Sequence, residues 1–381
     1  MQIDDMSGDV LAQAEGLYGL KTKWDCITGI IKTLNIPNDL QVRANKQDII
    51  LFGTGLAGKL AQQYFNENNV SVKFWCDNDA SKQGSFLDGI LIISPEELAR
   101  LDNPLVVITA KHYTREISEQ LQQLSIPHIS FDAYVVAKMQ SEIRFVYSEL
   151  LEDDHSKNVL VAVLKSMLLG TSKYCREVME RDEFFSLPEF LGMEQEVFVD
   201  AGAYVGDTLE RFIWNVTGVF QKIYAFEPGK IQFEAMERRL VRLSQEWGFD
   251  PKKVRLVRAG LGETDSFLSY SYNCKSPSGS HFGLVQGAAD EDVQVYSLDS
   301  YIGDETVSMI KVDIEGFELS MLKGARNLIK RCKPKLAISI YHKPEDLFEI
   351  PRYIHSLVPE YKMAIRHHSP RMLETILYCW K

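Results

Sequence analysis

Two stretches of the chain share one order of features: a β-rich apolar run, a turn broken by glycines, and the start of a helix. They are "DIILFGTGLAGKLAQQYF" at 48–65 and "VFVDAGAYVGDTLERF" at 197–212. After each of them, further short apolar runs alternate with helix-like stretches. Strands that alternate with helices in this way predict a parallel sheet covered by helices on both faces. The chain is therefore expected to be an α/β protein that contains two Rossmann-like units.

The alternation divides the 381 residues into four expected parts. An N-terminal helical segment at 1–45 precedes a small Rossmann-like domain at 46–135, and a helical connector at 136–190 precedes the larger α/β domain at 191–381. In the larger domain seven β-rich runs follow one another, and the short stretch "SPRML" joins the last two. A connection of this length suits an antiparallel hairpin, so we expect a seven-strand sheet whose last strand is antiparallel.

The composition excludes several kinds of partner. The formal net charge of −11 argues against a nucleic acid, because phosphate backbones are bound by basic faces. The first residues are acidic and lack the apolar core of a secretory signal, and no apolar run approaches the roughly 18 residues that a membrane span needs. The six cysteines are scattered without a C-x-x-C pair, which favours reduced thiols over a zinc site. We therefore expect a cytoplasmic protein that binds neither nucleic acid nor a membrane.

The second glycine turn has an acidic residue at the end of its strand. Asp200 closes the strand, Gly202 permits a tight turn, and Gly206 lies near the helix start. Ligands of open parallel sheets bind at this edge. A carboxylate here would repel a pyrophosphate but suits a cationic amino-acid group, which favours S-adenosylmethionine over NAD. Structural roles, such as a helix cap for Asp200, are the alternative.

The strand that follows ends in Glu227, about 20 residues beyond the turn, where a carboxylate can accept both hydroxyls of a ribose. A solvated loop charge before Pro228 is the structural alternative for this residue. The expected cofactor-binding residues are Asp200, Gly202, Ala203, Gly206, Thr208, Glu227 and Pro228.

Four segments carry a family resemblance. "FVDAGAYVGDT", "IYAFEPG", "SLDSYI" and above all "IKVDIEGFELSMLKGA" resemble the FkbM family of S-adenosylmethionine-dependent methyltransferases. The resemblance covers roughly residues 195–380 and implies a seven-strand methyltransferase fold and O-methylation of sugars or natural products. It also implies that Asp200, Gly202 and Gly206 hold the methionine end of the cofactor and that Glu227 holds its ribose. The segment 260–295 aligns poorly, so we expect substrate choice to reside there.

Methyl transfer to a hydroxyl requires alignment of the acceptor oxygen and removal of its proton. "IKVDIEGFE" places Asp313 at the end of the fourth strand, and Lys311 lies on the same face two residues earlier. The carboxylates of Asp313, Glu315 and Glu318 could activate an acceptor, bind a divalent metal or orient the helix that follows. A metal is not predicted, because no H-x-x-x-H or similar ligand spacing occurs, but these three carboxylates leave it open.

Two histidines are candidates for proton transfer. His342 follows the fifth strand on the carboxyl side of the sheet, where an imidazole could act as general base. His281, in "SPSGSHFG", could close over the site, although glycine and serine on both sides are equally typical of an ordinary loop. His367 and His368 rank lower. The expected catalytic residues are Asp313, His342, His281 and Lys311.

The first glycine turn matches the dinucleotide spacing G-x-G-x-x-G at Gly53, Gly55 and Gly58, directly after a strand and before a helix. Asp77, at the end of the next strand, stands where a ribose-binding acid is expected. The stretch "GILIISPEEL" that follows resembles small Rossmann-like domains of sugar-modifying enzymes, which are similar to binders of nucleotide sugars or dinucleotides. A second nucleotide site is therefore predicted here. A turn that only packs a strand against a helix is the alternative.

Three functions remain open at this stage. The leading one is an S-adenosylmethionine-dependent O-methyltransferase that acts on a sugar, a nucleotide-linked sugar or a natural product. The second is an NAD-dependent oxidoreductase or epimerase centred on the first glycine turn, although no Tyr-x-x-x-Lys follows for hydride chemistry. The third is a non-catalytic protein that binds nucleotide sugars. The expected partner is a small-molecule or carbohydrate acceptor, and a homo-oligomer is compatible with the sequence.

Overall fold

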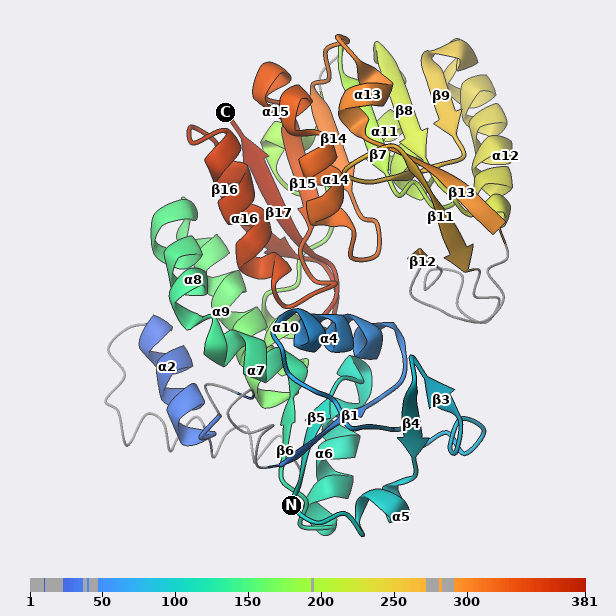
Figure 1. Cartoon of the computed structure of the whole chain (residues 1–381). Helices are drawn as coiled ribbons and strands as arrows, with labels where there is room; N and C mark the ends of the chain where they lie inside the picture. Colours follow the sequence, from blue (N-terminus) through green and yellow to red (C-terminus); the bar gives the residue numbers. More distant parts are fainter. Residues whose placement is uncertain are drawn as a thin grey trace.

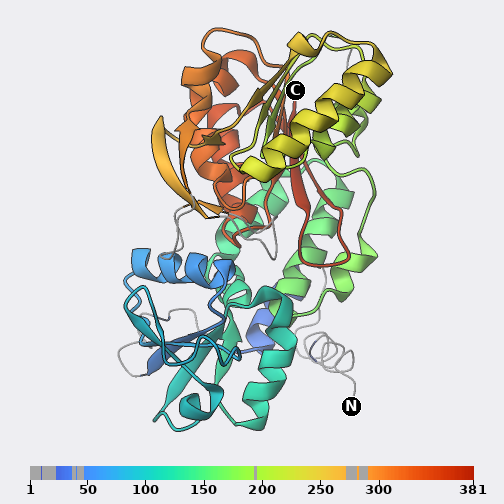
Figure 2. The same cartoon turned by 90° about the vertical axis from the view of Figure 1, so that its right-hand side faces the viewer.

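A computed structural model describes residues 10, 23–36, 40, 47–192, 195–271, 281–282 and 291–381, without the side chains at 112, 269–271, 281–282 and 291. Two α/β domains, one small and one larger, are joined by a helical segment (Figures 1 and 2). The expected α/β class with two Rossmann-like sheets is confirmed.

The small domain contains a six-stranded sheet in the order β3-β4-β2-β1-β5-β6. All neighbouring strands are parallel except β3 and β4. The strands are β1 (Asp48–Phe52), β2 (Phe74–Cys76), β3 (Phe86–Leu87), β4 (Ile90–Ile93), β5 (Pro104–Ile108) and β6 (His128–Ser130). The helices are α4 (Leu56–Glu67), α5 (Pro95–Leu98), the 3-10 turn η1 (Lys111–Tyr113) and α6 (Thr114–Gln123). The central strands β1 and β5 are almost wholly buried, as their unbroken apolar runs predict for parallel strands covered on both faces.

The sequence of the small domain predicts a last strand over the whole stretch "HISFDAYV" at 128–135, but only its first part is a strand. The strand β6 ends at Ser130, whose side chain accepts a hydrogen bond from the amide of Ala133 and so caps helix α7 (Phe131–Lys138). An N-cap serine therefore turns the rest of this apolar run into a helix.

Helices occupy the region between the two sheets. They are α2 (Lys23–Thr33), α7, α8 (Gln140–Phe145), the π-helical turn η2 (Val146–Leu150), α9 (Asp154–Leu169), α10 (Lys173–Glu177) and the 3-10 turn η3 (Pro188–Phe190). The side chain of Asp153 caps α9, and Gly170 ends it in a left-handed conformation with φ of 62°. The hydroxyl of Ser156 on α9 accepts a hydrogen bond from the amide of Ile365 at 2.9 Å. This contact fixes the helical segment to the larger domain.

The larger domain contains a seven-stranded sheet in the order β16-β17-β15-β14-β7-β8-β9. Its strands are β7 (Val197–Ala201), β8 (Lys222–Phe226), β9 (Val254–Val257), β14 (Met309–Val312), β15 (Lys335–Ser339), β16 (Lys362–His367) and β17 (Thr375–Trp380). The strand β17 is antiparallel to both of its neighbours, which confirms the expected sheet with a reversed last strand.

Successive side chains along each strand of this sheet point to opposite faces. Val199 and Ile338 pack in the core that includes α14 to α16, whereas Phe198 and Ala337 pack in the core that includes α11 and α12. The helices of the domain are α11 (Asp207–Asn215), α12 (Lys230–Trp247), the 3-10 turn η4 (Pro251–Lys253), α13 (Leu298–Ile302), α14 (Glu318–Gly324), α15 (Arg326–Cys332) and α16 (Asp346–Leu357).

The segment that sequence analysis treats as a poorly aligned stretch, 260–295, contains a small sheet of its own. Its order is β10-β13-β11-β12, with β10 (Gly260–Leu261), β11 (Ser266–Ser271), β12 (His281–Phe282) and β13 (Glu291–Tyr296). Val293 and Val295 on β13 are buried beneath it. In Figure 1 this small sheet projects from the larger domain on the side that faces the small domain. Within the described part of the chain, no helix combines the length and the apolar character that a bilayer crossing needs.

Candidate active site between the two domains

A cavity of about 930 Å³ lies between the two domains and is lined by residues of both. Its volume falls at the upper end of the range for small-molecule sites, about 300–1,000 Å³. Both glycine turns line it, with Gly53, Gly55 and Gly58 on one wall and Gly202 on the other. Sequence analysis treats the two turns as separate sites, but the fold brings them to one space.

The second glycine turn is held tightly against the neighbouring strand. Gly202 has φ of +78°, and a Cβ at this position would lie 1.8 Å from the carbonyl oxygen of Asp313. Gly206, with φ of +80°, is the N-cap of α11. Because only glycine permits the approach at Gly202, the ends of β7 and β14 meet there and Asp313 reaches the cavity wall.

Asp200 lies beneath the turn. It is fully buried, and its carboxylate forms an ion pair with Nζ of Lys311 at 3.1 Å. Lys311 also donates a hydrogen bond to the carbonyl of Gly202 at 2.6 Å. Burial opposes the charge on Lys311, but the carboxylates of Asp200 and Asp313 raise the pKa of this lysine above its usual value. Asp200 thus stabilises the turn through Lys311, and a direct contact with a cofactor stays a prediction.

Glu227 lies at the end of β8 on the cavity wall and is 7% exposed. Its Oε2 accepts a hydrogen bond from the amide of Tyr204 at 2.9 Å, and its Oε1 accepts one from the amide of Gly229 at 2.8 Å. Burial raises the pKa of Glu227 to about 7, although both amides act to lower it. Each oxygen has a further lone pair, so the carboxylate could still accept two ribose hydroxyls.

Asp313 meets two side chains from the loop after β15. The hydroxyl of Tyr341 donates to Oδ1 of Asp313 at 3.3 Å, and Nε2 of His342 lies 3.5 Å from the same oxygen. The same Nε2 lies 3.6 Å from Oε2 of Glu315. The predicted residues Asp313 and His342 therefore come together on the cavity wall. Sequence analysis missed Tyr341, whose only signal was its place directly before His342.

Glu318 is fixed by the backbone of the loop that precedes α14. It is fully buried, and its Oε1 accepts hydrogen bonds from the amides of Ile314 and Gly316 at 2.9 and 3.2 Å. Nδ1 of His342 lies 3.0 Å from this oxygen. Burial opposes protonation of His342, but the carboxylates of Glu318, Asp313 and Glu315 raise its pKa to about 10.

Two further acids on the cavity wall form a pair. The carboxyl groups of Glu183 and Glu374 are hydrogen-bonded to each other, and burial raises the pKa of both, that of Glu374 to about 9. Glu374 has φ of +57°, a conformation that is costly for a residue with a side chain. Burial thus favours the protonated form of these two carboxyl groups. Sequence analysis missed both residues, because neither belongs to a motif.

Each of the three glycines of the first turn has its own structural role, as in a dinucleotide-binding turn. Gly53 has φ of +114° and makes the turn itself. A Cβ at Gly58 would lie 2.1 Å from the carbonyl oxygen of Gly53, so this glycine permits close packing of helix and strand. A Cβ at Gly55 would meet none of the described atoms within 4 Å, and the residue faces the cavity. The backbone at Gly55 is therefore open to a ligand.

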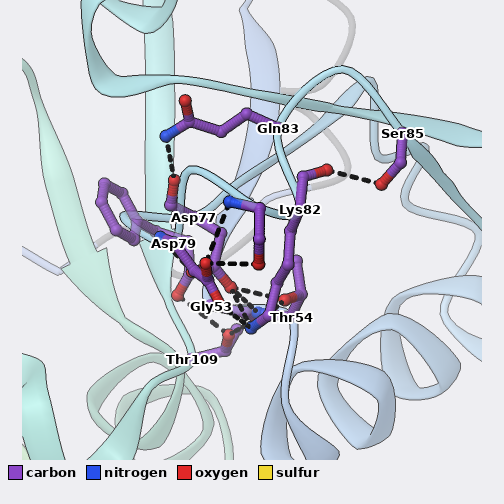
Figure 3. A network of polar contacts seen from close by, with 10 residues as sticks. Gly53, Thr54, Asp77, Asp79, Lys82, Gln83, Ser85 and Thr109 are labelled. Atoms are coloured by element: carbon purple, nitrogen blue, oxygen red, sulfur yellow. Dashed lines mark hydrogen bonds and ion pairs between the residues drawn. The ribbon is translucent and has the colours of Figure 1, made fainter.

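Asp77 holds this turn in place (Figure 3). Its Oδ2 accepts hydrogen bonds from the amide and the hydroxyl of Thr54 and from Nζ of Lys82, and its Oδ1 accepts one from the amide of Asp79. Burial opposes the charge on Asp77, but these hydrogen bonds lower its pKa. The predicted contact with a ribose stays a prediction. The structure shows that Asp77 brings Thr54 and Lys82 to the cavity wall.

The predicted residues divide by their position. Those that line the cavity are Gly53, Gly55, Gly58, Asp77, Gly202, Thr208, Glu227, Pro228, Lys311, Asp313, Glu315 and His342. Those that lie behind its wall are Asp200, Ala203, Gly206 and Glu318. His281 is in β12, and its side chain lies outside the described residues. His367 is buried in β16, where Nδ1 contacts the hydroxyl of Thr375, and His368 contacts that of Tyr378.

Comparisons with known proteins find methyltransferases among the proteins similar to this chain. The crystal structure of a methyltransferase FkbM from Methylobacillus flagellatus KT covers 100% of both chains with a TM-score of 0.56 and 25% identity. A hexuronic acid methyltransferase, AglP, from Haloferax volcanii is 25% identical over 145 residues, which is 36% of this chain and 53% of that protein. The chain thus spans about half the length of the curated relative that it matches.

Fold and site define the larger domain as a Rossmann-like methyltransferase domain. The model of the methyltransferase FkbM domain matches residues 200–361, and that of the C2185-like N-terminal domain matches residues 45–142. The match identifies residues 200–361 of the larger domain as a methyltransferase FkbM domain.

Proposed function

We propose that this protein is an S-adenosylmethionine-dependent O-methyltransferase whose acceptor is a carbohydrate linked to a nucleoside diphosphate. The observation that carries the proposal is the single cavity lined by both glycine turns. The cofactor would occupy the wall of the larger domain, and the acceptor's diphosphate would occupy the wall of the small domain.

The residues of the larger domain fit the cofactor. Glu227 would bind the ribose, since its carboxylate lies on the wall with a free lone pair on each oxygen. Gly202 lies on the cavity wall, where the methionine end would approach the backbone of the turn. When bound, S-adenosylmethionine supplies an electrophilic methyl group on a positively charged sulfur.

Asp313 would accept the proton of the acceptor hydroxyl. It lies at the end of β14 between the two glycine turns, and the hydroxyl of Tyr341 orients it. The acceptor oxygen forms a bond to the methyl carbon as the carbon–sulfur bond breaks, and its proton passes to the carboxylate. His342 is protonated at neutral pH in its present surroundings, so it is less suited than Asp313 to act as base.

Two observations support a nucleotide-linked sugar as acceptor. The relative from Haloferax volcanii is named as a methyltransferase of a hexuronic acid, which is a sugar. The small domain has an open backbone at Gly55 before α4, and Lys82 and Lys111 lie on the same wall, where they could neutralise phosphates. Lys111 is held by the carbonyl of Tyr341 at 2.9 Å, so it links this wall to the catalytic side.

Calorimetric titration tests the proposal. We expect S-adenosylmethionine to bind with one site per chain, UDP- or GDP-sugars to bind a second site, and NAD to bind neither. Glu227→Ala should weaken S-adenosylmethionine at least tenfold, whereas the control Glu234→Ala, an exposed acid on α12, should leave the affinity unchanged. Tight binding of NAD without S-adenosylmethionine would instead favour an oxidoreductase or epimerase that uses the first glycine turn.

Turnover tests the acceptor side. Asp313→Asn should abolish transfer of a labelled methyl group to the sugar while the affinity for S-adenosylmethionine stays largely intact. If the variant retains wild-type turnover, the proton is accepted elsewhere and the assignment of Asp313 is wrong.

A further inference from the structure

Four side chains meet where the loops after β14 and β15 approach each other. Asp313, Glu315 and Glu318 come from the first loop and the start of α14, and His342 comes from the second. Among the described residues, ligand atoms of Asp313, Glu318 and His342 lie within 4.8 Å of one another. Asp313, Glu315 and His342 also line the cavity.

Within this cluster, the buried imidazole of His342 is the side chain that points to a ligand. The side chain of His342 is 8% exposed, and its Nε2 has no hydrogen-bond partner among the described residues. The nearest acceptors, on Asp313 and Glu315, lie at 3.5 and 3.6 Å, which is too far for a hydrogen bond. A nitrogen in this position points at two carboxylates without bonding to either.

These distances are close to those of ligands that share a metal ion. Two ligand atoms at about 2.1 Å from one ion, at an angle between 90° and 109°, are separated by about 3.0–3.4 Å. Nε2 of His342 would have to approach each of the two carboxylate oxygens by only a few tenths of an ångström. Glu315 lies in a left-handed conformation with φ of +55°, which directs its carboxylate back towards the imidazole.

The opposite nitrogen of the ring lies beside a third carboxylate. Nδ1 of His342 lies 3.0 Å from Oε1 of Glu318, and that carboxylate is fixed by two backbone amides. A bound cation would displace the Nε2 proton, and a carboxylate that accepts the Nδ1 proton would keep Nε2 facing the cation, as in the carboxylate–histidine–metal arrangement of many metal sites. Glu318 would therefore act as a positioning residue behind the ligands.

We propose that Asp313, Glu315 and Nε2 of His342 form a binding site for a divalent cation on the cavity wall. Two carboxylates and one imidazole suit an ion of the Mn²⁺ type, which accepts both oxygen and nitrogen ligands. One oxygen of Asp313 would bind the cation, and the other would remain for the acceptor's proton. Cation binding to these side chains does not depend on the proposed methyl transfer.

The charge of the cavity wall indicates how a bound cation could assist binding of the acceptor. The described wall carries the carboxyl groups of Asp77, Glu116, Glu183, Asp207, Glu227, Asp313, Glu315 and Glu374, against the lysines 82, 111 and 311 and His342. Those carboxyl groups of the wall that are ionised would repel an acidic sugar. A divalent cation with free coordination positions towards the cavity would attract the oxygens of such an acceptor. This role in acceptor binding rests on the proposed function, whereas cation binding itself does not.

The test is a titration of the full chain with Mn²⁺, after removal of metals by chelation, with free Mn²⁺ measured by electron paramagnetic resonance. We expect one Mn²⁺ per chain, displaced by excess Mg²⁺, and at least tenfold weaker binding in Asp313→Asn and in Glu315→Gln. The matched control is Glu116→Gln, an acid of the same cavity on the small domain, which should bind Mn²⁺ as the wild type does. Circular dichroism and titration with S-adenosylmethionine show that each variant is folded.

Absence of stoichiometric Mn²⁺ binding, or equal binding by wild type, Asp313→Asn and Glu315→Gln, would overturn the proposal. The cluster would then be a protonated imidazole held among three carboxylates. Failure of the methyltransferase proposal would show differently, as a loss of S-adenosylmethionine binding or turnover in a chain that still binds Mn²⁺.

Discussion

At the residue scale, the protonation of Glu227 is linked to ligand binding. Its pKa of about 7 arises from burial, with opposing contributions from the amides of Gly229 and Tyr204 and from Lys311, and with Asp200 adding to the rise. Ribose hydroxyls donate best to the charged carboxylate, so binding of S-adenosylmethionine lowers this pKa. Below about pH 7 the carboxyl group of Glu227 is protonated in the free protein, and it must lose this proton when the cofactor binds.

We therefore expect the affinity for S-adenosylmethionine to rise as the pH increases through about 7 and to level off above it, with a change that approaches tenfold per pH unit on the acidic side. Calorimetry in buffers of different ionisation enthalpy measures both the affinity and the proton released. In Glu227→Gln the affinity should be weaker and this pH dependence should be absent. A wild-type affinity that is independent of pH would contradict the assignment.

The same carboxyl group predicts how stability depends on pH. Its pKa is raised in the folded state from 4.5 to about 7, so the neutral form stabilises the fold and this contribution is complete below pH 4.5. It is lost as the pH rises through about 7 and amounts to about 3 kcal/mol. Urea unfolding should show that the stability of Glu227→Gln relative to wild type improves by about this amount between pH 5 and pH 8. A constant difference between the two proteins would refute this account.

The residues of the candidate site could be predicted only where they belong to a motif or stand at the end of a strand. Asp313, Glu227 and His342 stand directly after β-rich runs, and parallel strands bring such positions to one edge. Glu374 has no such signal, because its role depends on a pairing with Glu183 from the helical segment, far away in the sequence.

At the scale of single elements, the helix α4 offers a matched pair of substitutions. Gly58→Ala places a Cβ 2.1 Å from the carbonyl oxygen of Gly53, which forces α4 away from β1. We expect a loss of about 2 kcal/mol in the free energy of unfolding. Gly55→Val meets open space at a φ of −77° and should leave this free energy nearly unchanged.

The same pair separates packing from binding. Gly55→Val should weaken a UDP- or GDP-sugar at least tenfold, since the side chain would occupy the space that a diphosphate approaches. Urea unfolding and calorimetry measure the two effects. Unchanged affinity for every nucleotide sugar in this variant would mean that the first glycine turn serves only to pack helix against strand.

Sequence analysis predicted most of the elements but not all. The seven strands of the larger sheet follow from apolar runs such as that of β15, since strands that are covered on both faces are predominantly apolar. The small sheet around β13 was not predicted, because it is short, and glycine and serine are frequent in its neighbourhood. The strand β6 was predicted too long, because an N-cap at Ser130 starts a helix within the apolar run.

At the scale of the whole molecule, the helical segment determines where the two domains meet. It packs against β16 through Ser156 and Asp153, and the turn η1 reaches across to Tyr341 through Lys111. These long-range contacts bring together two glycine turns about 150 residues apart in the chain. No local sequence pattern specifies that the two glycine turns lie close together, so the shared cavity could not be predicted from either turn alone.

The central claim is that one cavity holds two ligands, each on its own wall. Titration of a UDP- or GDP-sugar into protein saturated with S-adenosylhomocysteine tests it most directly, with Glu227→Ala and Gly55→Val measured in the same way. We predict that wild type binds both ligands at once, that Glu227→Ala loses only S-adenosylhomocysteine, and that Gly55→Val loses only the nucleotide sugar. Competition between the two ligands in wild type, or the loss of both in either folded variant, would contradict the claim.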